Sequence, residues 1–587
     1  MAPRIGAVAL LVAIVTSGLF YANALSNPFV VDDDWMVARN PIVRDPSLGN
    51  FAKSWTSEYV RGVADTSGVT QSEAPTVGYR PVTTTSYGLN AAISGVTPRS
   101  FRIVNVVLHA AAAWLVALWW GRATYPLAGA IAGSMILVHP VATDVVNRIV
   151  GRADILVVIG VAGFLVVQHA AEKGRWTWVR TVAAMAFVIV ALGAKESGVV
   201  VLPLAVMQLV QLGNARASAD EPPQRGRSQW RGAIAVALPL VLYIVARAQA
   251  TGAAVPACRR TAWDLTECPL AGKPLGERGA TAAALAWHYL RVFIWPWPLL
   301  AMDAPARLPT WLDPVVWLGG SAMICVVAVA GWFTLRRHPV AVALWWWIAG
   351  FLVVAQLLFP IGPYREVRLS YPLLPGLACA AALVVAAGFR ARWSAARAGA
   401  IITTAIALLV SGTTVVLRNR DWRSDLTAIE ADVRARPETP IVHLNLGDQY
   451  EIANRTGDAE REFVRATEAG PSFHQTWYQL AGFYERHGRE ADAARAYERA
   501  ALVAPSLPFA PLGLGILALN SGDLKGAALW LRRAEQLDAD DSSVQYNLAV
   551  LDSHLGHNDA AIARLERLVE TRGDKRAAEA LAILRGD

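Results

Sequence analysis

The chain has 587 residues, of which 54% are hydrophobic and only 17% are charged. Soluble domains carry about 25% charged residues, so this composition excludes an ordinary soluble protein. The formal net charge of +8 comes without a basic block interleaved with aromatic residues, and we expect no nucleic-acid partner. The apolar runs stop near residue 417, which predicts a polytopic helical membrane domain over 1–417 followed by a soluble domain.

The first apolar run covers residues 5–25, enough to span a bilayer, which takes about 20 residues. It is about twice as long as the ~7–15-residue core of a cleaved signal, so we expect a retained membrane helix. The stretch "NPFVVDDDW" follows at once and sets down Asp32, Asp33 and Asp34. Carboxylates at a helix end are often only solvated surface, so other parts of the chain must decide their role.

Eleven apolar runs are candidate membrane spans, two of them short. They are residues 5–25, 101–120, 126–140, 154–171, 177–193, 197–212, 232–249, 314–335, 340–359, 369–389 and 399–417. Lys and Arg are concentrated in the alternate short loops that share a side with the N-terminus, which places that terminus inside. An odd number of spans then puts the C-terminal domain outside, on the side of Asp32.

Residues 283–303 are harder to assign, because they contain His288, Arg291 and a WPWP sequence that would break a spanning helix. We interpret this segment as an interfacial helix on the outer face, where Trp and Tyr are preferred. If it were a true span, the C-terminal domain would lie inside. The outer loop before it contains Cys258 and Cys268, candidates for a disulfide in an oxidising compartment; two free thiols are the other reading.

The C-terminal part repeats with a period of 34 residues. Leu446, Leu480, Leu514 and Leu548 mark the period, each followed by Gly or Ala. This spacing resembles the tetratricopeptide repeat, a helix–turn–helix unit that stacks into an α-solenoid and binds peptides or proteins. We expect the solenoid over 440–587, with a capping helix in 571–587.

Residues 418–439 are expected to form a helix that connects the two domains. Trp422, Leu426, Ile429 and Val433 fall on one apolar stripe of that helix, which could dock the solenoid on the membrane domain.

Charged and polar residues gather in the loops that the predicted topology places outside. They are Asp32–Asp34, Arg80, the cluster His139, Asp144, Asn147, Arg148, Arg152 and Asp154, the pair Lys195 and Glu196, and the group Arg365, Glu366, Arg368 and Tyr371. Charges at membrane depth are costly and so are functional candidates. The cations suit an anionic partner, for which a lipid-linked phosphate is natural, and the acids suit proton abstraction from a hydroxyl.

Arg152, Lys195 and Arg368 are our candidates for binding a donor phosphate. Taken singly, Arg152 with Asp154 and Lys195 with Glu196 could be local ion pairs, but the clusters converge on one face. His139 more simply shapes or lines the site than binds metal, and His109 reads as a packed, hydrogen-bonded histidine. No zinc-site spacing is present, so we predict no metal ligands and no cofactor, while dependence on a divalent ion stays open.

Several stretches occur in the order and spacing of one known family. They are "NPFVVDDDWMVARN", "YRPVTTTSYGLN", "FRIVNVVLHA", "HPVATDVVNRIVGRAD", "KESGVVVLP" and "NRDWRSDLTAIEADVRARP". Together they closely resemble the transmembrane and tetratricopeptide-repeat O-mannosyltransferases, which are C-type glycosyltransferases. The resemblance covers nearly the whole chain.

The resemblance implies an enzyme that moves a sugar from a polyprenyl-phosphate donor to a hydroxyl on the exported side. It assigns Asp32 as general base and Asp33 as its support, with Asn40 at the family's spacing. The family usually has Glu and Arg adjacent before a Tyr in the last outer loop, whereas Val367 separates Glu366 from Arg368 here. Arg368 keeps the usual distance to Tyr371, so its role carries over better than that of Glu366.

The expected function is therefore transfer of a sugar, mannose by the resemblance, to an exported protein that the repeats bind. A transferase acting on a lipid or cell-wall glycan and a non-enzymatic membrane scaffold are the alternatives. The abundance of Arg over Lys and of Ala is typical of a GC-rich bacterial genome. We therefore expect a protein of the bacterial inner membrane with its site and its repeats on the periplasmic side.

Overall fold

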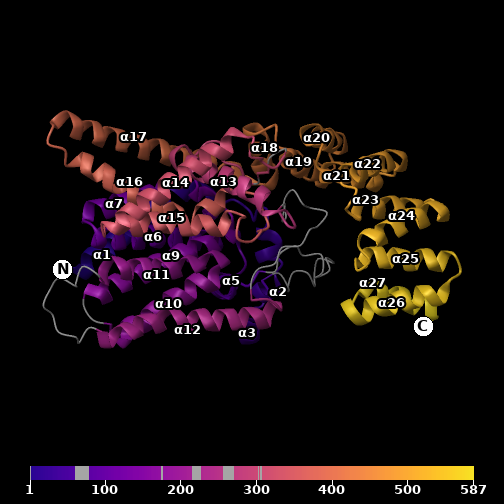
Figure 1. Cartoon of the computed structure of the whole chain (residues 1–587), viewed down its shortest axis with the longest axis horizontal. Helices are drawn as coiled ribbons and strands as arrows, with labels where there is room; N and C mark the ends of the chain where they lie inside the picture. Colours follow the sequence, from indigo (N-terminus) through magenta and orange to yellow (C-terminus); the bar gives the residue numbers. More distant parts are fainter. Residues whose placement is uncertain are drawn as a thin grey trace.

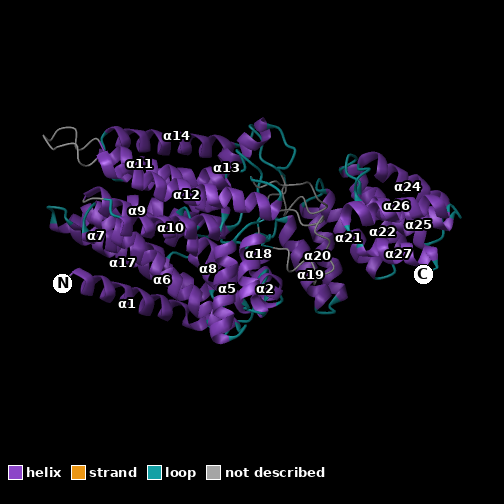
Figure 2. Ribbon diagram, turned by 90° about the horizontal axis from the view of Figure 1, so that it is seen from below, coloured by secondary structure: helices purple, strands orange, loops and turns teal. Residues whose placement is uncertain are grey.

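The computed structural model describes residues 2–59, 78–173, 176–213, 226–254, 270–301, 303–304 and 307–586. Within these ranges the regular secondary structure is helical, apart from one isolated bridge between Asp303 and Arg365. The helices form a bundle of apolar helices followed by a curved stack of short helix pairs (Figures 1 and 2). This confirms the predicted all-α class, a polytopic helical domain followed by a repeat solenoid.

The N-terminal bundle runs from α1 to α17. Its helices are α1 Ala2–Tyr21, α2 Pro41–Arg44, α3 Leu48–Thr56, α5 Pro81–Ser94, α6 Pro98–Ala123, α7 Pro126–Val138, α8 Ala142–Asn147, α9 Arg152–Lys173, α10 Trp178–Ala194, α11 Val201–Gly213, α12 Gly226–Thr251, α13 Leu275–Ile294, α14 Pro314–Leu335, α15 Val340–Val354, α16 Leu374–Phe389 and α17 Ser394–Arg418. Short helical turns join them, among them η2 Asp34–Ala38, η5 Glu196–Val200 and η8 Val367–Ser370.

The apolar runs predicted from sequence are all helical. Six helices of the described chain, α1, α6, α9, α12, α14 and α17, are long and apolar enough to cross a membrane. The other five runs correspond to shorter apolar helices: α7, α10, η5 with α11, α15 and α16. The composition and number of these helices indicate membrane association.

Small residues bring neighbouring helices close together inside the bundle. A Cβ added to Gly129 of α7 would lie 2.3 Å from the carbonyl oxygen of Ala117 in α6. One added to Gly160 of α9 would lie 2.5 Å from the backbone nitrogen of Ala191 in α10. Close backbone approach at small residues is a main source of packing energy between membrane helices, because lipid is as apolar as the side chains.

The segment predicted to be interfacial forms most of α13, which begins earlier than expected. Arg278 near its start donates to the carbonyl of Gln356 after α15, and the carbonyl of Phe293 near its end contacts the His139 ring after α7. Between these contacts α13 packs side by side with α14, where Gly319 lies against the backbone of Ala283. Beyond Ile294 the helix stops and the WPWP sequence begins.

The C-terminal part consists of α18 Asp425–Ala435, α19 Pro440–Ile452, α20 Thr456–Ala469, α21 His474–Arg486, α22 Glu490–Val503, α23 Phe509–Asn520, α24 Leu524–Leu537, α25 Ser542–His554, α26 Asn558–Arg572 and α27 Lys575–Arg585. Asn454, Gly488, Gly522 and Gly556 all have positive φ, between 57° and 79°, at the turns inside the four repeats. The 34-residue spacing therefore reflects one backbone conformation repeated four times.

The connecting helix α18 docks on the bundle, but not by the whole predicted stripe. Trp422 is 1% exposed and packs against Val30 and Ala301, as the stripe implied. Leu426, Ile429 and Val433 are only half-buried. The reason is that carboxylates do part of the docking: Asp425 accepts from the Val31 N–H at 2.6 Å, and Asp432 accepts from the Ala301 N–H at 2.9 Å.

We predict that the repeats share a compartment with Asp32. The first repeat lies directly over the end of the bundle that carries Asp32, since Ile441 and Asp32 line the same cavity. Topology reporters inserted after residue 95 and fused after residue 587 should give the same compartment signal. Opposite signals would contradict this placement.

Candidate active site

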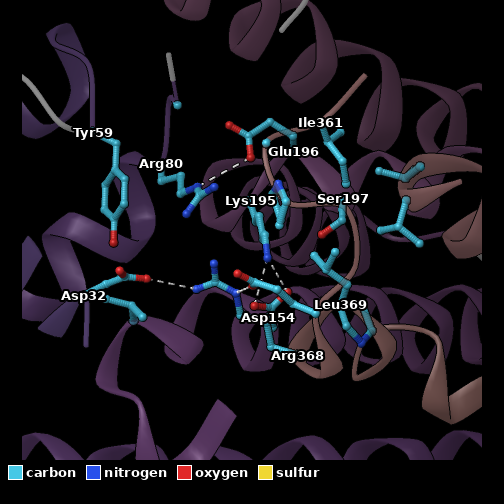
Figure 3. Close-up of a pocket in the computed structure, with 18 of the residues that line it drawn as sticks. Asp32, Tyr59, Arg80, Asp154, Lys195, Glu196, Ser197, Ile361, Arg368 and Leu369 are labelled. Atoms are coloured by element: carbon cyan, nitrogen blue, oxygen red, sulfur yellow. Dashed lines mark hydrogen bonds and ion pairs between the residues drawn. The ribbon is translucent and has the colours of Figure 1, made fainter. Parts of the chain in front are cut away.

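A cavity of about 390 Å³ lies at the end of the bundle that faces the solenoid. Its charged lining comes from segments far apart in sequence, and Figure 3 shows several of these side chains converging. The ionisable residues among the described lining are Asp32, Tyr59, Arg80, Asp154, Lys195, Glu196, Glu366, Arg368 and Asp448. The predicted outer loops therefore do meet at one place.

Asp32 stands at the edge of this cavity on the turn between α1 and η2. The preceding residue, Val31, has φ of 53°, a left-handed conformation that is costly for a β-branched residue. Asp32 Oδ2 lies 2.6 Å from Arg148 Nη2 and 3.5 Å from Arg368 Nη1. Burial favours the neutral acid, but the two guanidinium groups outweigh it and lower the pKa of Asp32, which is therefore ionised at neutral pH.

Arg148 holds Asp32 from behind. Its side chain is 1% exposed and also contacts Asp144, 3.5 Å away and equally buried. Burial raises the pKa of Asp144, and Arg148 opposes that rise. Sequence reasoning named Arg148 in its loop cluster but gave it no role. Arg148 is four residues after Asp144, a spacing that puts both on one helical face, and this could have indicated their ion pair.

The cations of the cavity pair across elements and not with their sequence neighbours. Lys195 Nζ lies 2.8 Å from Asp154 Oδ1, and Arg80 Nε lies 3.4 Å from Glu196 Oε2 (Figure 3). Arg368 contacts Glu366 as well as Asp32. The local pairs Arg152 with Asp154 and Lys195 with Glu196 do not form among the described ion pairs. Positive and negative side chains thus alternate along the lining, and each cation is paired with a carboxylate.

Asp33 lies outside the cavity and is fully buried. Its two carboxylate oxygens accept from the backbone N–H groups of Val150 at 3.0 Å and Val30 at 3.3 Å. Burial raises its pKa to about 6, against the opposing effect of backbone hydrogen bonds and Arg148. Asp33 therefore fixes the Asp32 turn to the segment that carries Arg148, which is a supporting role.

Arg152 does not reach the cavity, so its proposed part in phosphate binding does not fit the structure. It has no exposed surface, and its guanidinium donates to Asn105 Oδ1 at 2.8 Å and to Asn90 Oδ1 at 2.9 Å. It also donates to the carbonyl of Phe101 and lies over the Tyr87 ring. One helical turn beyond Arg148, this side chain points into the bundle and ties α5, α6 and α9 together.

His139 and Tyr371 are also absent from the lining. The His139 ring stacks on Phe293 and contacts its carbonyl at 3.1 Å, so it anchors α13. Tyr371 Oη lies 2.7 Å from His109 Nδ1 in the bundle interior, which agrees with a packed, hydrogen-bonded His109. Both residues support the site from outside it.

Cys258 and Cys268 lie outside the described residues. In the part of the chain that the structure describes, no group of three or more His, Cys, Asp or Glu side chains is arranged to hold a metal ion.

Sequence reasoning missed two contributions to the cavity. Tyr59, at the end of the α3 segment, lies under Arg80, with the guanidinium 4.9 Å from the ring centre. The other contribution comes from the solenoid: Ile441, Leu444, Asn445 and Asp448 of α19 and Gln475 of α21. The α19 residues follow an i, i+3, i+4, i+7 pattern, which puts them on one helix face. That pattern also fits an ordinary repeat core, so it gave no distinct signal.

Fold and site together define a polytopic helical protein with a charged cavity at one end, closed by a repeat solenoid. A tetratricopeptide-repeat family model matches residues 444–511 and 484–542. The protein O-mannosyl-transferase TMTC3 of Mus musculus is 23% identical over 81% of this chain and 58% of its own length. TMTC1 of Mus musculus is 31% identical over 29% of this chain and 17% of its own length. The chain is thus a relative of the protein O-mannosyl-transferases, as its motifs indicated.

Alignments that run through both domains cover between 55% and 63% of the length of the curated relatives. Among solved structures, a tetratricopeptide-repeat protein of Thermus thermophilus is 20% identical over 29% of this chain and 91% of its own length, with a TM-score of 0.24.

We predict different effects for substitutions of Arg152 and Arg368, which the sequence analysis grouped together as phosphate-binding candidates: one should lower stability, the other binding. Arg152→Gln should lower the stability by roughly 2–5 kcal/mol, because buried amide acceptors lose their donors. Arg368→Gln should chiefly weaken binding of a polyprenyl phosphate, by about 1.5–3 kcal/mol, although it also removes the cation that pairs with the buried Glu366. Thermal unfolding in detergent and a lipid-phosphate binding assay measure the two effects. If the Arg152→Gln protein is as stable as the wild type but binds the polyprenyl phosphate more weakly, Arg152 contacts the phosphate and the present assignment is wrong.

Proposed function

We propose that this protein is a membrane glycosyltransferase that moves a sugar from a polyprenyl-phosphate donor to a hydroxyl of an exported protein. The observation that carries the proposal is a cavity in which an ionised Asp32 faces Arg368, with Lys195 and Arg80 nearby. The printed names of the relatives, protein O-mannosyl-transferases, support mannose as the sugar and protein as the acceptor. The donor is proposed from the apolar, membrane-length helices of the bundle and from the resemblance.

Asp32 would act as the general base. The acceptor hydroxyl gives its proton to Asp32 as its oxygen forms the new bond to the sugar carbon, and the bond from that carbon to the phosphate oxygen breaks. The leaving phosphate carries the negative charge away. A single displacement of this kind inverts the configuration at the sugar carbon.

Arg368 would couple donor binding to the strength of the base. In the structure it is shared between Asp32 and Glu366. A phosphate that draws its guanidinium away removes one of the two cations that lower the pKa of Asp32. The carboxylate then becomes a stronger base only when the donor is present. Lys195, held by Asp154, would stabilise the phosphate as it leaves.

The solenoid would deliver the acceptor. Its first two repeats form part of the cavity wall, so a polypeptide bound along the repeats has a short path to Asp32. Burial raises the pKa of Asp448, on this wall, to about 7 despite the nearby Arg486. A carboxyl group that is protonated part of the time at neutral pH can both donate to and accept from an acceptor backbone.

A transfer assay with labelled polyprenyl-phosphate mannose tests the function. The wild-type protein should label a protein acceptor, whereas Asp32→Asn should lose 10²- to 10⁴-fold in rate, because Asn keeps the shape but cannot take the proton. Glu430→Gln, at a half-buried position of α18 that does not line the cavity, is the control and should keep wild-type turnover. Label in a lipid or glycan would favour the alternative acceptor, and no transfer to any acceptor would favour a scaffold.

A deletion tests the role of the solenoid. Removing 440–587 would take away part of the cavity wall, so the informative deletion is 507–587, which keeps the two repeats that line it. Transfer to a short soluble hydroxyl acceptor should persist, while kcat/KM for the polypeptide acceptor should fall at least tenfold, since tethering raises the effective concentration. Size-exclusion chromatography checks folding. If the deleted protein keeps full activity toward both the short acceptor and the polypeptide acceptor, the later repeats serve in assembly and not in acceptor binding.

A further inference from the structure

A second cavity, of about 470 Å³, lies beside α13 and apart from the catalytic one. One face of α13 contributes Trp287, His288 and Arg291 to its lining. Three further arginines reach it from different segments: Arg307 before α14, Arg365 from the loop after α15, and Arg436 after α18. Four arginines therefore meet where the bundle, the outer loops and the solenoid connection come together.

The positive charge of this cavity is only partly balanced. Arg307 pairs with Asp313, the one carboxylate among the described lining residues, at 2.8 Å. Arg365 pairs at 2.6 Å with Asp303, which is not a lining residue. Among the described ion pairs, Arg436 contacts only Glu438, which is 3.8 Å away and 67% exposed. Exposed pairs of this kind contribute little, so Arg436 stays available to a ligand.

Arg291 is the least compensated of the four. Its Nη1 donates to the backbone carbonyls of Trp295 and Trp297, which carry no net charge. Its Nη2 is buried without a hydrogen bond, and no carboxylate of the described chain lies within 4.0 Å. Burial and the nearby Arg436 and Arg365 lower the pKa of Arg291, the direction expected where positive charges crowd together.

His288 adds a polar contact that a ligand in the cavity can use. Its side chain lines the cavity at 7% exposure and makes no hydrogen bond to the described residues. Its ring nitrogens are not among the buried unpartnered atoms of the described chain, so they open into the cavity, where a ligand or water can meet them. Burial, Arg365, Arg291 and Arg436 hold the pKa of His288 well below its ordinary value, so the ring is neutral and offers one N–H.

The surroundings of the cavity are those of a membrane surface. Trp295 and Trp297, just after α13, are 66% and 58% exposed, and Trp311 and Trp317, near the start of α14, are 48% and 62% exposed. Exposed tryptophans gather at the level of lipid headgroups, where their rings meet both apolar and polar surroundings. The arginines beside them therefore lie at headgroup level.

We propose that this second cavity binds the phosphate group of an anionic membrane lipid. Arginine forms paired hydrogen bonds with phosphate oxygens, and basic pockets at the membrane surface suit lipid headgroups. The site is independent of the donor phosphate. Arg365 is three residues from Arg368, and Arg436 directly follows α18. A headgroup bound to Arg365 and Arg436 therefore also holds two segments in place: the loop that carries Arg368 into the first cavity, and the link from α18 to the solenoid.

Lipid-dependent thermal unfolding of the full-length protein in neutral detergent tests the proposal. Increasing amounts of phosphatidylglycerol should raise the unfolding midpoint of the wild-type protein, whereas phosphatidylcholine should not. Arg436→Gln and Arg291→Gln should each raise the apparent Kd for phosphatidylglycerol at least tenfold. Arg436 is only partly buried, so its variant carries little risk of misfolding.

Arg434→Gln is the matched control, since Arg434 is on the same segment but is 66% exposed and not part of the cavity. It should keep the wild-type apparent Kd. Equal effects of the two lipids, or equal losses in the Arg434 and Arg436 variants, would overturn the proposal. Inorganic phosphate at the same concentration is expected to protect much less. Equal protection by it would overturn the assignment to a lipid.

Discussion

The structure of the candidate site depends on one carboxylate held between two guanidinium groups. Asp32 lies 2.6 Å from the buried Arg148 and 3.5 Å from Arg368. A buried arginine is costly unless it is paired, so Arg148 needs both Asp32 and Asp144. This requirement fixes the Asp32 turn against the segment before α9. Arg368 is left as the partner that can be exchanged, and it is the one that lines the cavity.

The same turn joins the membrane bundle to the solenoid. The Val31 N–H, next to Asp32, donates to Asp425 of α18, and Asp432 of the same helix holds the backbone of Ala301. Through these contacts α18 sets the position of α19, whose one face completes the cavity wall. The two domains are therefore not simply tethered: the Asp32 turn, the connecting helix and the first repeat form one connected structure. A ligand that shifts the position of one of these three segments therefore also shifts its contacts with the other two.

Much of the fold could be predicted, because apolar length and a 34-residue period constrain helices directly. The convergence of charged loops also followed, since a membrane places alternate loops on one side. The direction of individual side chains did not follow. Arg148 and Arg152 are one turn apart, yet one contacts Asp32 and the other hydrogen-bonds Asn105 and Asn90 inside the bundle. Only packing among α5, α6 and α9 decides this. The docking of α18 was also mispredicted in part, because its carboxylates bond to backbone that an apolar stripe cannot reveal.

The central claim is that one cavity brings a lipid phosphate and an acceptor hydroxyl together beside Asp32. A cryo-electron microscopy structure of the full-length protein with a bound polyprenyl phosphate tests it most directly. The account predicts phosphate density within hydrogen-bond distance of Arg368 and Lys195, with the Arg368 guanidinium moved away from Asp32 and the Asp32 contact with Arg148 retained. Phosphate density away from this cavity, with Asp32 and Arg368 still paired, would contradict it.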